Sequence, residues 1–232
     1  MRKICTAACA VMMVAGLIGE GTVSAKSKRE RKSKEDQALE IIKETGQFDV
    51  YTEKTSRKNH YIPSGYMGDY GDIKVNDRWT EEPRSGKTCI QIKYTVDMTQ
   101  GAGWAGIYWQ NPANNWGTRK GGYNLSGAKR VAFWARGEQG GEFISEFKVG
   151  GITGEYFDSD QVGITDIELT KNWKRYEIDL SESDLSYISG GFCWAANLDN
   201  NPDGITFYLD DIVYEFKDKN ESKKKKKKES KK

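Results

Sequence analysis

Apolar and polar residues alternate along much of the chain between residues 45 and 216, and this alternation limits what the chain can fold into. Alternation with a period of two turns successive side chains to opposite faces of a strand, and no stretch of useful length repeats with the period of a helix. Clusters of glycine, asparagine and aspartate separate the alternating runs, as turns between strands require. The runs lie at residues 88–96, 104–110, 130–136, 142–149, 173–180, 191–196 and 205–216. We therefore predict an all-β fold, a jelly-roll sandwich of two antiparallel sheets.

Charge and aromatic content divide the chain into segments. Residues 45–216 carry 17 basic and 25 acidic side chains, together with all 27 aromatic residues. Residues 217–232 carry ten lysines, three acids and no apolar residue, so they are unable to build a core. We predict one domain over residues 47–216, long enough to bury a sizeable core, followed by a disordered tail over residues 217–232. We expect the protein to be a monomer.

The first 25 residues have the parts of a secretion signal in the right order. A basic start at residues 1–3 precedes an apolar run of 15 residues, and residues 23–25 end in the small side chains that signal peptidase needs. An uncleaved anchor is the alternative, but the run is shorter than the roughly 20 residues of a membrane-spanning helix. We expect a mature chain that starts near Lys26 and is secreted, periplasmic or attached to the cell surface. Residues 26–46 follow as a basic segment with one short amphipathic helix.

Two cysteines, Cys89 and Cys193, remain once the signal is removed. In an oxidising compartment the two are able to pair, and a loop of that length contributes roughly 3–5 kcal/mol if the geometry allows it. The alternative is two buried thiols in separate strands, and the sequence does not decide between them.

Residues 101–123 hold three tryptophans and two tyrosines among glycines, asparagines and a glutamine. Flat aromatic faces beside amide groups suit a ligand with apolar C–H faces edged by hydroxyl groups, which describes a sugar. Alternation turns some of these side chains away from the core, along with aromatic and charged side chains of residues 130–136 and 142–149. Gathered on one sheet, they would form a trough with an aromatic floor, whereas packing beneath loops is the alternative. The candidate sugar-binding residues are Trp104, Tyr108, Gln110, Asn115, Trp116, Trp134, Arg136, Glu142 and Glu146.

The chain also resembles carbohydrate-binding modules of the galactose-binding-like β-jelly-roll superfamily. The resemblance follows the order of GWAGIYWQNPANNWG, GGYNLSGAKRVAFWARGEQGGE, LTKNWKRYEIDLS, DLSYISGGFCW and GITFYLDDIVYE, and covers about residues 48–216. It implies a jelly roll that binds a polysaccharide or glycan without cleaving it. Such modules bind either in a trough across one sheet or at loops on one edge, and the resemblance does not decide which applies.

Calcium is the one metal for which the sequence offers candidate ligands. Residues 199–210 match the spacing of an EF-hand loop, but residues 205–216 read as a strand. Asp210 would then lie more than about 20 Å from Asp203, so a turn between strands is the better interpretation of these residues. The resemblance separately implies a structural calcium held by an acid of the last strand. Asp210 is the matching position, with Asp49 or Glu53 as its partners.

Two other functions remain as alternatives to a non-catalytic sugar-binding protein. A glycoside hydrolase would use Glu142 and Glu146, which a strand would hold about 13 Å apart. Hydrolysis needs carboxyl groups roughly 5–10 Å apart, so we expect no catalytic residues. The second alternative is an envelope or adhesion protein whose jelly roll binds another protein. The acidic domain disfavours nucleic acid, while the lysine-rich tail is either simply solvated or attracted to an anionic cell surface.

Overall fold

The computed structural model describes residues 33–217, which begin with helix α1 (Lys34–Thr45). Ser33 caps the helix by accepting the N–H of Asp36, whose carboxylate in turn accepts the N–H of Ser33. Gly46, with a φ of 72°, ends the helix in the left-handed conformation that glycine adopts without strain. The predicted short helix is therefore confirmed. The predicted signal peptide and nearly all of the lysine-rich tail lie outside the described residues.

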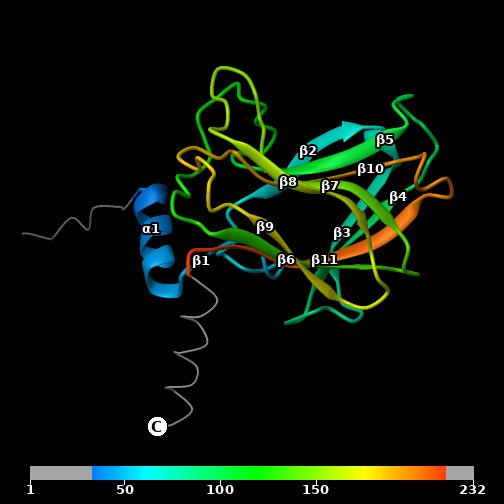
Figure 1. Cartoon of the computed structure of the whole chain (residues 1–232), viewed down its shortest axis with the longest axis horizontal. Coiled ribbons are helices and arrows are strands. Elements are labelled where there is room, and N and C mark those ends of the chain that lie inside the picture. The colour runs from blue at the N-terminus through cyan, green and yellow to red at the C-terminus, as the bar shows by residue number, and fades with distance from the viewer. Residues whose placement is uncertain (1–32, 218–232) are drawn as a thin grey trace, which may run out of the picture. The chain divides into compact units, whose positions relative to one another are not determined.

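Within residues 33–217 the strands form two antiparallel sheets stacked face to face (Figure 1). One sheet has the strand order β3-β4-β11-β6-β9, with β1 also paired to β11, and the other has the order β2-β5-β10-β7-β8. The strands are β1 (Gln47–Tyr51), β2 (Ile62–Gly68), β3 (Ile73–Trp79), β4 (Cys89–Tyr94), β5 (Trp104–Gln110), β6 (Arg130–Gly137), β7 (Phe143–Gly150), β8 (Gln161–Glu168), β9 (Lys174–Asp179), β10 (Gly190–Asn197) and β11 (Ile205–Glu215). The predicted all-β, two-sheet jelly-roll sandwich is confirmed.

All seven predicted runs are strands, and four further strands have no predicted counterpart. Three of the four, β2, β3 and β8, lie at the edges of their sheets, where a weaker apolar pattern is sufficient. β2 contains Pro63 and two glycines, which mask the alternation. β1 is only five residues long and follows directly on the helix.

The core fills the space between the two sheets. Strand alternation places Ile107 and Trp109 of β5 against Phe133 of β6 and Phe192 of β10, and all four side chains are fully buried. Phe133 and Phe192 lie 5.0 Å apart between ring centroids. Because the apolar set points inward on both sheets, the remaining side chains of the same strands turn to the two outer faces.

The two cysteines are free thiols, so the disulfide considered from the sequence is not formed. Cys89 belongs to β4 in one sheet and Cys193 to β10 in the other, and alternation directs both away from the core. Stacked sheets are about 10 Å apart, and two outward-pointing side chains add to that separation. Burial raises the pKa of Cys89 to about 12 and also raises that of Cys193.

α1 is the longest helix among the described residues, at 12 residues. Among residues 33–217, no helix combines the length and the apolar content that crossing a bilayer requires.

Candidate functional site

Strand register decides which outward side chains become neighbours on the sheet β2-β5-β10-β7-β8. One row across the strands consists of Gly65, Tyr108, Cys193, Lys148 and Gly163, and the next consists of Met67, Gly106, Ala195, Glu146 and Thr165. Trp104 lies beyond the second row, on the same face of β5 and opposite Asn197. We call the surface formed by these residues, together with Trp116 at its far end, the trough.

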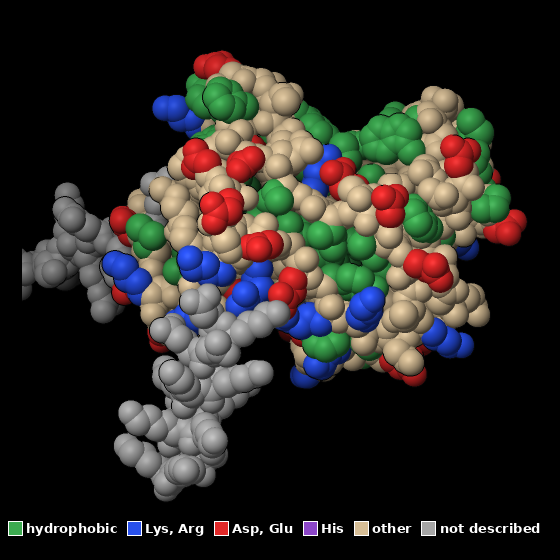
Figure 2. Space-filling model, viewed as in Figure 1, with side chains coloured by type: hydrophobic (Ala, Val, Ile, Leu, Met, Phe, Trp, Pro, Cys, Tyr) green, Lys and Arg blue, Asp and Glu red, His purple; other side chains and the backbone are tan. Residues whose placement is uncertain are grey.

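Small residues form the middle of the trough, where the methyl group of Met67 lies next to Gly106. A side chain on Gly106 would approach the backbone oxygen of Trp194 to 2.5 Å, so this position has no room for one. Ala195 beside it adds only a methyl group. In Figure 2 the upper edge of the molecule is hollowed above the strands that Figure 1 labels β7 and β10, with hydrophobic side chains at both ends of the hollow.

Two indole rings stand at the ends of the trough and are open to solvent. Trp104 is 39% exposed and Trp116 is 41% exposed, values unusual for so large an apolar side chain. Trp116 meets Tyr108 edge-on, with ring centroids 5.9 Å apart. Trp104 and Tyr108 are four residues apart on one strand, which separates them by about 13 Å. The aromatic groups thus span more than one sugar ring.

Tyr108 is fixed at the floor by its own hydroxyl group, which donates to the backbone oxygen of Gly150 at 3.1 Å. Burial, followed by the nearby Cys193 and Glu146, raises the pKa of Tyr108, so the hydroxyl stays protonated and keeps this bond. The ring is a rigid support against which Trp116 packs.

One ion pair crosses the floor. Glu146 and Lys148 turn to the same side of β7, and their charged atoms lie 2.7 Å apart. The Lys148 ammonium also lies 5.7 Å from the centroid of the Tyr108 ring, within range of a cation–π contact. Each side chain keeps partial exposure, so the pair offers both donors and acceptors to a ligand in the trough.

Four of the nine predicted sugar-binding residues meet in the trough, namely Trp104, Tyr108, Trp116 and Glu146. Gln110 and Asn115 have no exposed surface and hold the loop that carries Trp116. Gln110 donates to the backbone oxygen of Asn115, and Asn115 donates to that of Arg119. Their assignment as direct sugar ligands is therefore wrong, although they position one of the two indoles.

Trp134 and Arg136 lie on the other sheet, because β6 pairs with β11 and β9. The outward aromatic and charged residues are therefore divided between the two sheets, and the condition for a single trough built from all of them is not met. Lys148, Asn197 and Met67 belong to the trough but were not among the predicted ligands. Alternation from Glu146 does identify Lys148, whereas nothing in the sequence pairs Met67 or Asn197 with β5.

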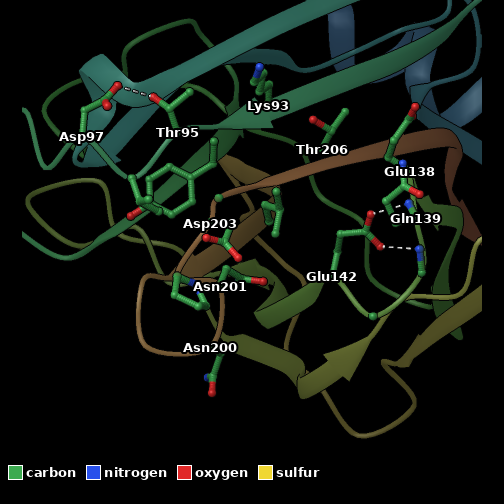
Figure 3. A pocket seen from close by; sticks show the side chains of 17 residues that line it. Lys93, Thr95, Asp97, Glu138, Gln139, Glu142, Asn200, Asn201, Asp203 and Thr206 are labelled. Atoms are coloured by element: carbon green, nitrogen blue, oxygen red, sulfur yellow. Dashed lines mark hydrogen bonds between the residues drawn. The ribbon is translucent and has the colours of Figure 1, made fainter.

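Glu142 lies at one edge of a cavity of about 660 Å³ between the turn 198–204 and the loop 137–142 (Figure 3). Its carboxylate accepts the backbone N–H groups of Gln139 at 2.7 Å and Gly140 at 2.9 Å. Glu146 lies in the trough instead, paired with Lys148. The two glutamates therefore do not face each other across a common space. Asp203 also lines this cavity, from the turn that the sequence predicted for residues 199–204.

Asp210 does not fit the predicted calcium site. Its carboxylate accepts the backbone N–H groups of Arg84, Ser85 and Asp211, so its oxygen atoms are already used. Glu53 likewise accepts the N–H of Lys87. Among the described residues, no three His, Cys, Asp or Glu side chains are placed to hold a metal ion together. These acids anchor the segment 80–88, which lies over the outer face of the sheet β3-β4-β11-β6-β9.

Three aspartates of this sheet, Asp210, Asp211 and Asp49, have raised pKa values. Burial and the neighbouring Asp211 raise the pKa of Asp210 to about 7, although its three N–H donors act against the rise. Burial likewise raises the pKa of Asp211 and of Asp49.

No family model and no curated protein matches the chain. Solved structures do match. The chain is similar to carbohydrate-binding modules. A family 30 module shares 14% identity over 75% of this chain and 89% of its own, with a TM-score of 0.49. A family 11 module of Clostridium thermocellum, solved with a β-1,3-1,4-mixed-linked tetrasaccharide, shares 14% identity over 72% of this chain and 94% of its own, with a TM-score of 0.48. A family 29 module shares 9% identity over 73% of this chain and 88% of its own, with a TM-score of 0.43. At these values the likeness to the modules concerns the fold, and any role of the trough depends on the residues of this chain.

Proposed function

We propose that this protein binds a polysaccharide in the trough and does not cleave it. The observation that carries the proposal is the pair of solvent-exposed indoles, Trp104 and Trp116, at the two ends of a low floor. Between them lie the Tyr108 ring and the Glu146–Lys148 ion pair. Flat apolar surfaces with fixed polar groups between them match the alternation of C–H faces and hydroxyl groups along a sugar chain.

Physical estimates favour weak binding led by stacking. Each sugar face that covers an indole removes apolar area from water, worth about 25 cal/mol per Å². Each hydrogen bond from Glu146, Lys148 or Asn197 to a hydroxyl group adds roughly 1 kcal/mol net, and somewhat more where the partner is charged. An open trough with few contacts is therefore expected to bind with a Kd between about 1 μM and 1 mM.

The positions of the Glu142 and Glu146 carboxylates favour binding of the polysaccharide without its hydrolysis. Hydrolysis of a glycosidic bond needs two carboxyl groups roughly 5–10 Å apart on either side of that bond. Glu146 is committed to Lys148, and Glu142 is committed to backbone N–H groups in a different cavity. We expect no reducing ends to be released from any glucan, and Glu146→Gln to alter affinity only.

A glycan array followed by titration calorimetry tests the proposal. A β-1,3-1,4-mixed-linked tetrasaccharide is one suitable soluble probe for the calorimetry. Trp104→Ala and Trp116→Ala should each weaken binding at least tenfold, because truncation of an aromatic residue that dominates a contact costs about 2 kcal/mol or more. Trp134→Ala is the matched control, since it removes an indole from the opposite sheet. An array blank for all sugars, beside a single stable protein partner in a pull-down, would favour the adhesion alternative instead.

We further propose that the protein is exported and that its lysine-rich tail adds affinity for an anionic surface. Residues 1–25 have the composition of a cleavable signal, and residues 217–232 carry ten lysines. N-terminal sequencing of the exported protein should begin near Lys26. Removal of the tail should weaken binding to anionic vesicles at low salt and leave binding to neutral glycan unchanged.

A further inference from the structure

On the outer face of the sheet β3-β4-β11-β6-β9, Arg136 is a buried cation without a hydrogen bond to any described residue. The residue is 8% exposed, and its Nε atom is enclosed without a partner. The guanidinium carbon lies 3.9 Å from the centroid of the Tyr208 ring and 5.5 Å from that of Trp173. Aromatic rings stabilise a cation but satisfy none of its five N–H donors. Nearly all buried polar groups in folded proteins have a hydrogen-bond partner, so the enclosed Nε atom of Arg136 calls for an explanation.

The single ionic contact of Arg136 among the described residues is with Glu82, and it is weak. The Arg136 Nη2 and Glu82 Oε2 atoms lie 3.7 Å apart, which is longer than a hydrogen bond. The Glu82 side chain is 85% exposed, so water screens the pair. Glu82 also has a φ of 50°, a left-handed conformation that is uncommon for a residue other than glycine. Its backbone oxygen accepts the indole N–H of Trp173 at 2.9 Å, which keeps the residue at this place.

Other acids on this face are already engaged. Glu138 accepts the hydroxyl group of Tyr208. Asp210 accepts the N–H groups of Arg84 and Ser85. The carboxylate best placed to satisfy Arg136 would therefore be one that arrives from outside the protein, at the position that Glu82 occupies loosely.

We propose that Arg136 binds the carboxylate of an acidic polysaccharide, one built from hexuronate units, and that Glu82 holds this place in the free protein. A guanidinium group binds a carboxylate through two parallel hydrogen bonds, which the exposed Glu82 does not make. Three half-buried indoles share this face, from Trp79, Trp134 and Trp173, and offer apolar surface to a sugar ring. Arg84, stacked 3.9 Å above the Trp134 ring, adds a second positive charge.

This second site is independent of the trough. β6 and β5 belong to different sheets, and the core separates their outer faces. The protein is then able to hold a neutral chain in the trough and an acidic chain on the opposite face at the same time.

Titration calorimetry with a trimer of galacturonate, and with its methyl ester, tests the inference. The wild-type protein should bind the acid and not the ester, because the ester lacks the charge that Arg136 recognises. Glu82→Gln should bind the acid up to about fivefold more tightly, the factor that removal of an exposed competing ion pair is worth. Glu81→Gln is the matched control, because it removes an equal charge from the neighbouring exposed position.

Two further variants keep the test decisive. Arg136→Gln should abolish binding of the acid, with an unchanged circular dichroism spectrum as the check on folding. Trp104→Ala should weaken binding of neutral glycan and leave binding of the acid unchanged. Equal binding of the methyl ester, equal effects of Glu81→Gln and Glu82→Gln, or loss of acid binding in Trp104→Ala would each overturn the inference. Equally tight binding of poly-glutamate would overturn its claim for a sugar.

Discussion

The two outer faces of the sandwich carry the same kinds of side chain but differ in what covers them. In the trough, Trp104 and Trp116 are open to solvent, and Glu146 and Lys148 satisfy each other at 2.7 Å. On the opposite face the segment 80–88 lies over the strands. There Arg84 covers one side of the Trp134 ring, and Arg136 has no hydrogen bond to any described residue.

This difference shows that the strands determine the orientation of a side chain, whereas the loops determine its accessibility to solvent. Alternation along a strand decides which side chains turn outward, and it does so equally on both sheets. The connecting segments then decide whether an outward ring stays accessible or becomes part of a second, smaller core. On the covered face the buried carboxylate of Asp210 holds the segment 80–88 over the strands, whereas the buried carboxylate of Asp69 holds the loop 100–103 beside Trp104 at one end of the trough.

The largest expected difference between the faces is that the covered face, through Asp210, makes the stability of the protein depend on pH. Folding raises the pKa of Asp210 from 3.8 to about 7, because the carboxyl group is buried and lies beside Asp211. Between pH 4 and pH 7 the folded protein keeps a proton on Asp210 that the unfolded chain has lost, so the contribution of Asp210 to the free energy of unfolding should fall as the pH rises through this window. His60, whose pKa is lowered by burial, acts in the opposite direction. At about 1.4 kcal/mol per pKa unit, the loss from Asp210 is roughly 3–4 kcal/mol and levels off above pH 7. Urea unfolding at pH 4.5 and at pH 7.5 measures it.

A single substitution sharpens this test. Asp211→Asn removes the neighbouring charge, tolerates the positive φ of 48°, and should recover about 1 kcal/mol at pH 7.5. Asp166→Asn on β8 is the matched control, because Asp166 is exposed and has a similar φ of 55°. If both variants change the curve equally, Asp210 is not its source. An increase in melting temperature on addition of calcium would show instead that these acids are able to bind the ion.

The next largest effect is expected from a substitution that fills the trough and leaves its indole rings unchanged. Ala195→Leu places a larger side chain on the floor between Gly106 and Glu146, where a sugar would otherwise lie. We expect binding of neutral glycan to weaken about tenfold or more, since a clash of this size costs roughly 1–3 kcal/mol. Thr206→Leu adds bulk to the outward side of β11 and should leave that binding unchanged. Unaltered affinity in Ala195→Leu would remove the trough from consideration as the binding surface.

The sequence was sufficient for the sandwich and for the outward orientation of single residues. Trp104 and Tyr108 were correctly predicted to leave the core, because Ala105, Ile107 and Trp109 form an unbroken apolar set. Alternation is local, so it carries this information without knowledge of the partner strand.

The sequence was not sufficient for the composition of the site, which depends on long-range pairing. Trp134 turns outward as predicted, but β6 pairs with β11, so it never reaches Trp104. Asn115 has the polarity of a sugar ligand, yet its amide donates to Arg119 inside the loop. Whether a polar group faces a ligand or its own loop depends on the loop conformation, which residue type and spacing do not fix.

The smallest expected effect is a change in the reaction rates of the two buried thiols, one on each face of the sandwich. Cys193 lies beneath the trough in contact with Tyr108, and Cys89 is buried at the start of β4, directly after the segment 80–88. Their raised pKa values and lack of exposure predict slow reaction of both with a disulfide reagent at pH 8 in the folded protein. The variants Cys89→Ala and Cys193→Ala isolate one thiol each. Neutral glycan should slow the reaction of Cys193 a few-fold and leave Cys89 unchanged, because the ligand covers one face alone. Galacturonate should do the reverse if Arg136 binds it, and protection of both thiols by either ligand would show that the two faces do not act separately.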